Sequence, residues 1–364
     1  MASRSRPLIL FVLISSFSLT VTQSQQSQDS AAASTVQVKA SPPANPASAP
    51  GQLVLDAVVI DKSGKPVSGV QPRDFTILDN GQPAKILSMR PQGGAVDLAH
   101  ATEVILVIDE VNCVFVTVQR VRAGVREFLA KSGGALPYPV SLAFFTERGI
   151  QIQTHPSRDG NVVVAALDQH KLPPPRTGAT FGNGLVPPTQ RLQESMDALS
   201  SLIVQEQATP WKKMVIWISL GWPTDTSLPD TLSLKDKERV FHSVVQYSTA
   251  LREGRMTLYS IDPSGGMSSS NYKNYMKGLT NPKAAATADM GLQTIAAQTG
   301  GLTIYGIDSI ANLINRCTPD LGAFYTLSIE APQANRANEY HSLDLRLGTP
   351  GLTARTRTGY YAQP

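Results

Sequence analysis

The residue best placed to do chemistry in this sequence is Asp109, the carboxylate that ends the apolar run 104–108. The run contains only β-branched and aliphatic residues, which is typical of a strand buried on both sides of a parallel sheet. Open α/β sheets bind ligands beyond the carboxyl ends of their strands, so Asp109 would stand at a ligand-binding position. The run predicts where a site would lie but does not identify a ligand.

Strands and helices must alternate along the middle of the chain to place Asp109 there. Strand patterns lie at 104–109, 139–146, 214–219, 256–261 and 302–305, with an antiparallel edge strand at 150–154. Helix patterns lie at 116–131, 161–170, 189–207, 234–252 and 289–298, and a last helix to 316 is capped by Asp308. This alternation predicts an α/β domain over 101–320 with a doubly wound, mostly parallel sheet.

Two β-rich segments, 52–95 and 321–364, flank the predicted α/β domain. Strand patterns occupy 53–60, 75–79, 82–89, 324–330, 340–347 and 352–361. Asn80-Gly81 suits a type I′ turn, so 75–89 should form a hairpin. Because each segment alone has too small an apolar face for stability, we expect the two to pack as one discontinuous antiparallel β-sandwich.

The first fifty residues have the composition of an export signal and a leader. Arg4 and Arg6 precede an apolar stretch at 8–19 and small residues at 22–24, which predicts a signal peptide over 1–24. Residues 25–51, rich in Ser, Gln, Ala and Pro, should be disordered. The apolar stretch is short for a membrane span. We therefore expect an exported mature chain (periplasmic, cell-surface or secreted) without a transmembrane segment.

Composition and cysteine content narrow the function further. The 364 residues are 41% hydrophobic and 16% charged, which suits a folded protein with a lightly charged surface. The formal charge of +4 would fall to +2 without Arg4 and Arg6, and the basic residues are scattered, so nucleic acid is not an expected partner. Because exported proteins meet an oxidising environment, Cys113 and Cys317 are candidates for a disulfide. The predicted topology separates them, so we expect two free thiols.

Four long loops should share one edge of the sheet with Asp109. They are the loops at 110–115, 171–188, 220–232 and 262–287. Long loops in compact domains are often functional, although 262–287 could equally be a mobile connection. We expect a partner-binding rim that includes Asn183, Trp222 and Asp225. Trp222 would be an aromatic contact residue there, whereas Trp217 should belong to the core.

Several short motifs together resemble a known family. They are Asp61-x-x-Gly-x-Pro-Val67, Asp74-Phe75, Asp79-Asn-Gly81, Val107-Ile-Asp109, the Gly-Ala-Thr at 178–180, Tyr259-Ser-Ile-Asp262, Ala297-Gln-Thr-Gly-Gly301 and Arg357-Thr-Gly-Tyr-Tyr361. Over residues 52–364 the chain resembles von Willebrand factor A (VWFA) domain proteins, and more specifically the secreted VWFA-related family typical of Acidobacteria. The terminal motif is the most specific part of the resemblance.

The resemblance implies a metal site that this sequence has largely lost. In members with a working site, an Asp-x-Ser-x-Ser motif, a loop Thr and a second Asp bind Mg²⁺ through oxygen ligands. Asp109 matches the first Asp and Thr180 the loop Thr, but Val111 and Cys113 replace the serines, and Leu220 replaces the second Asp. A thiol is a poor ligand for a hard cation and valine is none.

Two interpretations of Asp109 therefore stand side by side. Asn112, Glu110 or Asp225 could supply substitute oxygens, which gives a degenerate Mg²⁺ or Mn²⁺ site built on Asp109, Asn112 and Thr180. In the other interpretation, which the substitutions favour, Asp109 binds no metal. It would instead hydrogen-bond the loop backbone and cap the turn that follows.

The expected function is an exported, non-enzymatic, adhesion-type module whose rim binds a protein or a cell-surface polymer. The sequence contains no Gly-x-Ser-x-Gly elbow, no phosphate-binding glycine loop after a strand and no metalloprotease helix. Its five histidines are dispersed without ligand spacing. One alternative is a structural cell-envelope component whose β-sandwich is the working surface. Another is an unrecognised hydrolase.

Overall fold

The computed structural model describes residues 51–92, 102–153, 155–172, 187–209, 211–224, 232–264, 276–322 and 324–364. They all belong to the second of two compact units of the chain, Pro42–Pro364. The predicted signal peptide and nearly all of the predicted leader lie outside the described residues, so both stay predictions. Within the described ranges, no helix has the length and apolar character needed to cross a membrane.

The largest sheet is mostly parallel and is organised around the strand that ends in Asp109. Its strands are β5 (Thr102–Asp109), β6 (Ala135–Thr146), β7 (Gly149–Ile152), β8 (Ser157–Asp159), β9 (Lys212–Ile218), β10 (Met256–Asp262) and β11 (Thr303–Tyr305). The order is β11-β10-β9-β5-β6-β7, and β7 and β8 pair antiparallel with β6. The chain builds outward from β5 on one side and then from β9 on the other. The topological switch point therefore lies between β5 and β9.

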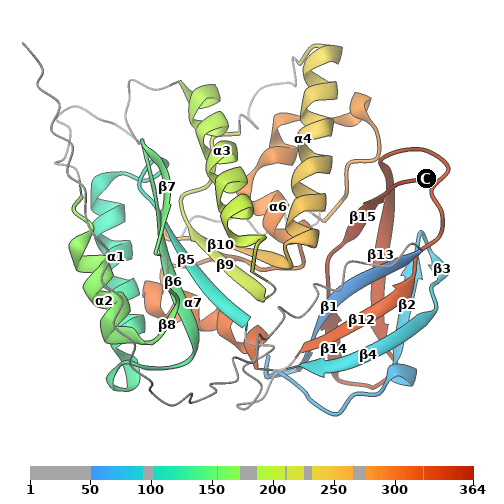
Figure 1. Ribbon diagram of the computed structural model, residues 1–364, viewed down its shortest axis with the longest axis horizontal. Coiled ribbons are helices and arrows are strands. Elements are labelled where there is room, and N and C mark those ends of the chain that lie inside the picture. The colour runs from blue at the N-terminus through green and yellow to red at the C-terminus, as the bar shows by residue number, and fades with distance from the viewer. Residues whose placement is uncertain are drawn as a thin grey trace, which may run out of the picture. The chain divides into compact units, whose positions relative to one another are not determined.

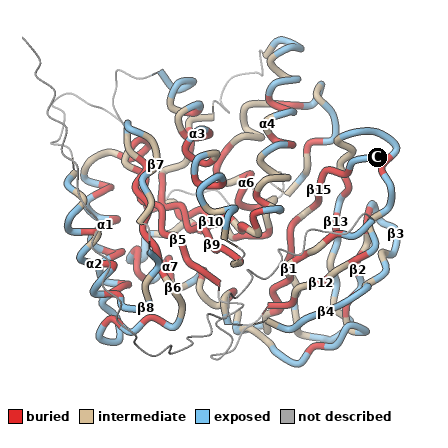
Figure 2. Tube along the Cα trace, viewed as in Figure 1, coloured by how far each residue is buried: buried red, intermediate tan, exposed pale blue. Residues whose placement is uncertain are grey.

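Helices cover both faces of this sheet (Figure 1). On one face lie α1 (Phe115–Ala130), α2 (Gly160–Gln169) and α7 (Ile310–Cys317), and on the other α3 (Pro188–Glu206), α4 (Leu234–Glu253) and α6 (Leu292–Gln298). Alternate residues of β5 enter the two cores: Leu106 faces the first group of helices and Val107 the second. Figure 2 shows the central strands buried along their length. The predicted doubly wound α/β architecture is confirmed.

The segments from the two ends of the described chain form a pair of antiparallel sheets. One contains β1 (Gln52–Asp61), β4 (Ile86–Gln92), β12 (Phe324–Glu330) and β14 (Leu352–Arg355), in the order β14-β1-β12-β4. The other contains β2 (Phe75–Asp79), β3 (Gln82–Pro83), β13 (Glu339–Leu347) and β15 (Gly359–Ala362), in the order β15-β13-β2-β3. Leu55, Ile77, Leu327 and Leu343 share one core between them. The predicted discontinuous β-sandwich is confirmed.

Two strand predictions in the sandwich were wrong. The Asn80-Gly81 turn has positive φ at both residues, as a type I′ turn requires. The predicted second arm, 82–89, stays with β2 only through 82–83 and the Ala84 N–H, which donates to the Ile77 carbonyl at 2.9 Å, and the chain then crosses to β12 as β4. The predicted single strand 352–361 is divided between β14 and β15, which belong to different sheets.

Short 3₁₀ helices connect several elements. They are η1 (Pro72–Asp74), η3 (Lys131–Gly134), η4 (Pro282–Ala284), η5 (Thr287–Met290) and η6 (Thr318–Leu321). The cap of α7 is Ser309, whose side chain accepts from the Asn312 N–H, and not Asp308 as predicted. Cys113 and Cys317 are both buried and free, which confirms the expectation of two separate thiols.

Buried charges join the sandwich to the amino ends of β9 and β10. Asp56 on β1 accepts from Arg255 Nη2 at 3.3 Å and from Thr326 Oγ1 at 2.8 Å. Lys212 Nζ lies 3.7 Å from the centre of the Phe324 ring. Burial acts to raise the pKa of Asp56, but the charges of Lys212 and Arg255 outweigh it and hold that pKa below its usual value.

Candidate functional site

Asp109 ends β5 at the topological switch point, next to the end of β9. All eight residues of β5 are buried, and the strand pairs in parallel with β6 on one side and with β9 on the other. Its side chains enter the cores on both faces of the sheet, which accounts for its continuous apolar sequence. This position is where ligands enter doubly wound sheets, so the hydrogen-bonding state of Asp109 decides what the site can do.

The carboxylate of Asp109 is saturated by donors from its own chain. Oδ1 accepts from the backbone N–H groups of Val111 at 3.0 Å and Asn112 at 2.8 Å. Oδ2 accepts from Asn112 Nδ2 and from Trp217 Nε1, each at 3.0 Å. Only 1% of Asp109 is exposed. Each oxygen thus accepts two N–H groups, which leaves no free lone pair for a substrate proton or a cation.

Asn112 extends this network to the neighbouring helix. Its Nδ2 also donates to Ser195 Oγ on α3 at 3.0 Å, and Ser195 Oγ donates to the Arg191 carbonyl at 2.7 Å. The reverse amide orientation would place Asn112 Oδ1 against the negative Oδ2 of Asp109, which is repulsive. The orientation found leaves Asn112 Oδ1 buried, with no hydrogen-bond partner among the residues that the structure describes. The loop after β5 is therefore fixed to β9 and α3 through side chains.

Burial governs the protonation of both titratable groups at this point. It raises the pKa of Asp109, and the hydrogen bonds from Asn112 and Trp217 offset only part of that effect. Burial, and then the charge of Asp109, also raise the pKa of the Cys113 thiol. A thiol held in its protonated form is neither a strong nucleophile nor a metal ligand.

The described residues do not fit a Mg²⁺ or Mn²⁺ site. Such a cation takes oxygen ligands in octahedral geometry. The lone pairs of Asp109 already accept hydrogen bonds, and the Asn112 side chain directs its amide nitrogen, and not its oxygen, towards Asp109. A search of the described ranges finds no cluster of three His, Cys, Asp or Glu able to hold a metal. Thr180, the third predicted ligand, lies outside those ranges. The contacts of Asp109 instead match the alternative in which it caps its own loop.

Of the three predicted rim residues, the described part of the chain contains Trp222. Asn183 and Asp225 lie outside it. Trp222 is only 4% exposed and meets Trp217 edge-on, with the ring centres 5.3 Å apart. Its burial corrects the expectation of an exposed aromatic contact, because the indole belongs to the core cluster that α3 and α6 form with the sheet. Trp217 belongs to the core, as predicted.

Sequence reasoning missed a second polar pair beside Asp109. His170 Nε2 lies 2.9 Å from Glu110 Oε1, and the His170 ring stacks on Phe144 at 3.8 Å between centres. Arg122 Nη2 donates to the Leu167 and His170 carbonyls, where a cation suits the end of α2. Because sixty residues separate the pair in sequence, no local spacing could have indicated it.

Among the described residues, three large apolar side chains are exposed at the same edge of the sheet as Asp109. Val116 is the second residue of α1, which follows β5, Leu234 begins α4 after β9, and Ile307 follows β11. Their exposed fractions are 68%, 67% and 95%. Parallel strands end at one edge, so the helices and loops that follow them begin there as well. We call these three residues the rim trio.

Comparison with known proteins finds only remote likenesses. No family model matches the chain, and no curated protein matches it significantly. The solved structures with some similarity include a proximal thread matrix protein of the mussel byssus (11% identity, TM-score 0.35, 61% of this chain and 48% of that one). They also include the SpRpn10 VWA domain (10%, 0.32, 61% and 98%) and manganese-loaded TRAP of Plasmodium vivax (9%, 0.33, 73% and 95%).

Likenesses at this level carry no argument about function, and the chain spans about half the length of the mussel protein. The fold rests on the strand order itself, which agrees with the doubly wound α/β fold that the VWFA resemblance implies.

Proposed function

We propose that this chain is a non-catalytic, metal-independent protein-binding module whose working surface is the rim trio. The observation that carries the proposal is the contrast at one edge of the sheet: the carboxylate is closed by its own chain, while apolar side chains stand open to solvent. A closed, buried carboxylate neither coordinates an ion nor takes a proton from a substrate. Exposed Val, Leu and Ile side chains can still gain free energy by packing against a partner.

The location of the rim trio favours a binding role over the alternative that these are ordinary, scattered surface residues. Single exposed apolar residues are ordinary and need no explanation. Here three separate elements, α1, α4 and the turn after β11, each present one at the ligand-binding edge of the sheet. The partner expected from this chemistry is a protein with a complementary apolar surface. A cell-surface polymer is the other partner class that the rim prediction allows.

The test is crosslinking of the tagged chain in its native cells, followed by identification of the captured partners. The triple variant Val116→Ser, Leu234→Ser, Ile307→Ser should lose the partners captured by the wild type. The matched control is Val162→Ser with Val204→Ser. Their side chains are 50% and 62% exposed and lie at the start of α2 and the end of α3, near the opposite edge of the sheet. The control should retain the partners.

Two outcomes would contradict the proposal. Capture that disappears on adding EDTA and returns with Mg²⁺ would establish a metal-dependent site. Capture that survives the triple variant but is lost in Leu87→Ser would move the working surface to the sandwich, where Leu87 on β4 is 41% exposed. That second outcome corresponds to the structural-component alternative.

We also infer that the module works outside the cytoplasm. The support is the signal-like segment 1–24, with Arg4 and Arg6 ahead of an apolar stretch. Cell fractionation followed by mass spectrometry of the amino terminus should place the protein in an exported fraction, beginning near residue 25. A cytoplasmic chain that retains residues 1–24 would contradict export without touching the binding proposal.

A further inference from the structure

The terminal motif places a buried cation between the carboxyl-terminal strands and α4. Arg357 lies between β14 and β15 and is 9% exposed. Its Nε donates to the Gly359 carbonyl at 2.8 Å. Its Nη2 donates to the Ser248 carbonyl at 3.1 Å and to Ser248 Oγ at 3.2 Å. These contacts fix where the guanidinium lies, but each acceptor is neutral.

No carboxylate of the described residues pairs with Arg357. The charged side chain that lowers its pKa is another cation, Arg252, whose own partner is Glu253 at 3.0 Å, and Tyr340 has a smaller effect in the opposite direction. Burial, and then the charge of Arg252, lower the pKa of Arg357 to about 9. The carboxyl end of α4 offsets about half an elementary charge at most. A cation this deeply buried is normally paired, because desolvation without a partner is costly.

Unused hydrogen-bond donors surround this charge. Arg357 Nη1 makes no hydrogen bond within the described ranges and is not sealed from solvent. The Ser248 hydroxyl accepts from Arg357, and its own proton has no acceptor among the described residues. Thr358 Oγ1 has no partner among the described residues but is sealed from solvent. The guanidinium Nη1 and the Ser248 hydroxyl are thus the groups available to an acceptor.

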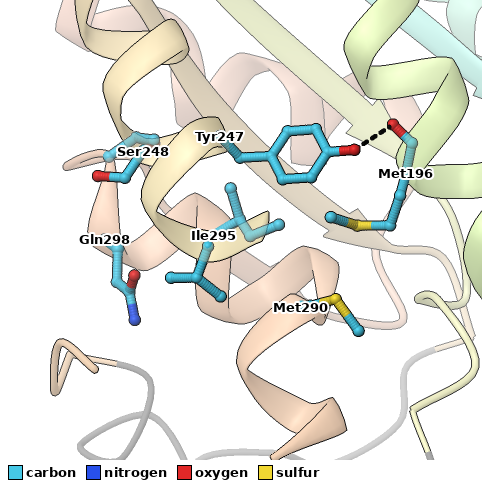
Figure 3. Close-up of a pocket in the computed structure, with 8 residues that line it drawn as sticks. Met196, Tyr247, Ser248, Met290, Ile295 and Gln298 are labelled. Carbon is cyan, nitrogen blue, oxygen red and sulfur yellow. Dashed lines mark hydrogen bonds between the residues drawn. The ribbon is translucent and has the colours of Figure 1, made fainter. Parts of the chain in front are cut away.

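A small hollow between α3, α4 and α6 borders this cluster at Ser248 (Figure 3), and Arg357 and Thr358 are not among its lining residues. Its lining residues are Met196, Val244, Tyr247, Ser248, Met290, Ile295, Gln298 and Thr299. Two of them hold the Arg357 segment: Ser248 accepts from Arg357, and the Gln298 carbonyl accepts from the Thr358 N–H at 3.1 Å. Tyr247 is already engaged, because its hydroxyl donates to the Met196 carbonyl. The polar end of the hollow is therefore the end next to Arg357.

Gly300 allows the chain to bring these groups together. Its φ is +87°, and a Cβ there would lie 2.7–2.8 Å from the backbone of Thr356 and Arg357. The turn after α6 can approach the terminal segment this closely only without a side chain. The two motifs at 297–301 and 357–361, distant in sequence, therefore meet at one place.

We propose that Arg357 and Ser248 bind the oxyanion of a carboxylate or phosphate group. An oxyanion accepts from several N–H and O–H donors at once and supplies the negative charge that the described chain lacks at this point. The site is separate from the rim trio and depends on neither a metal nor the proposed rim function. Carboxylates and phosphates both present an oxyanion, and titrations with acetate and with phosphate distinguish the two classes.

The test measures thermal unfolding of the purified chain against increasing sodium phosphate, and in a second series sodium acetate. Ionic strength is held constant with sodium chloride. The wild-type midpoint should rise and saturate, by about 4 °C at a hundredfold excess over Kd. Arg357→Gln should abolish the saturable rise. The matched control is Arg346→Gln, an exposed arginine on β13 paired with Asp344, and it should retain the rise.

A milder variant covers the case in which Arg357→Gln fails to fold. Ser248→Ala keeps the carbonyl that accepts from Arg357 and removes one donor to the anion, so affinity should fall about fivefold. A saturable rise with one probe alone supports the proposal and assigns the oxyanion class. The proposal is overturned if neither probe gives a saturable rise, or if the rise is unchanged in both variants. General salt stabilisation is nonsaturable and common to all variants.

Discussion

At the residue scale, Asp109 stabilises the loop that follows β5. Four N–H donors converge on it from three residues, two of them in the next turn and one across the sheet in β9. Hydrogen bonds to a charged acceptor contribute more than neutral ones. The substitutions around it fit this role, because Val111 and Cys113 are buried apolar neighbours. A hydrated cation would need polar groups at those two positions.

Asp109→Ala should therefore lower the free energy of unfolding by about 3–5 kcal/mol, since it leaves buried donors without an acceptor. Urea unfolding measures the change. Asp61→Ala is the matched control, because Asp61 also accepts from neighbouring N–H groups but lies in an exposed turn, so its loss should change stability little. EDTA or added Mg²⁺ should leave the wild-type midpoint where it is. A metal-dependent midpoint that Asp109→Ala abolishes would refute the structural role.

At the scale of elements, glycines set how closely a turn can approach a strand. Gly301 ends the turn between α6 and β11, and a Cβ there would lie 1.9 Å from the Leu258 carbonyl oxygen on β10. That contact is with backbone, which cannot rotate away as a flexible side chain can. The motif at 297–301 is thus a packing requirement of the sheet as well as a neighbour of Arg357.

Gly301→Ala should destabilise the protein by at least about 2 kcal/mol, because the added methyl group must displace β10 or the turn. Gly348→Ala is the matched control. A Cβ at Gly348 would meet no atom closer than 3.9 Å, so its stability should stay close to wild type. Thermal unfolding of the two variants side by side gives the comparison. Equal midpoints would show that the turn yields easily and that the close approach is unimportant.

At the scale of the whole described unit, the sandwich forms only when distant segments meet. In each of its sheets, strands from before the α/β region pair with strands from after it, as β1 does with β12 and β2 with β13. Asp56 and Arg255 then connect the sandwich to the α/β region, near Lys212 and Phe324. The stability of each region therefore depends on the charged contacts that it makes with the other region.

Asp56→Ala should cost about 3–5 kcal/mol at neutral pH, because it leaves Arg255 and Lys212 buried without this counter-ion. The folded-state pKa of Asp56 is lowered, so its contribution is present above the unfolded-state pKa and is lost as pH falls through the folded value. The difference in unfolding free energy between wild type and variant should stay constant above about pH 5 and become smaller below about pH 3.8. Denaturant titrations across that range measure it.

The control is Asp344→Ala, which breaks the exposed pair with Arg346. Exposed ion pairs contribute little, so this variant should follow the wild-type profile. If the difference in unfolding free energy between wild type and Asp56→Ala does not become smaller in acid, Asp56 stabilises the fold through packing and not through its charge.

Much of the architecture could be predicted from local pattern. The unbroken apolar run of β5, the helix periodicities and the Asn80-Gly81 turn are short-range signals, and each produced the expected element. The errors arose where the choice between distant pairing partners decides which sheet a strand joins. The segment after Pro83 left its hairpin for β12, and 352–361 divided between two sheets, because the free edges of distant strands were available.

For the candidate site, the sequence by itself determined that Asp109 stands at the carboxyl end of a central strand, because burial on both faces leaves a hydrophobic record in the residues. Tertiary structure alone decided the partners of that carboxylate. Trp217 and Ser195 reach it or its neighbour Asn112 from β9 and α3, and no spacing in the chain encodes those contacts. The same holds for Trp222, whose burial depends on packing with α3 and α6, and for Arg357, whose lack of a counter-ion among the described residues appears only in three dimensions.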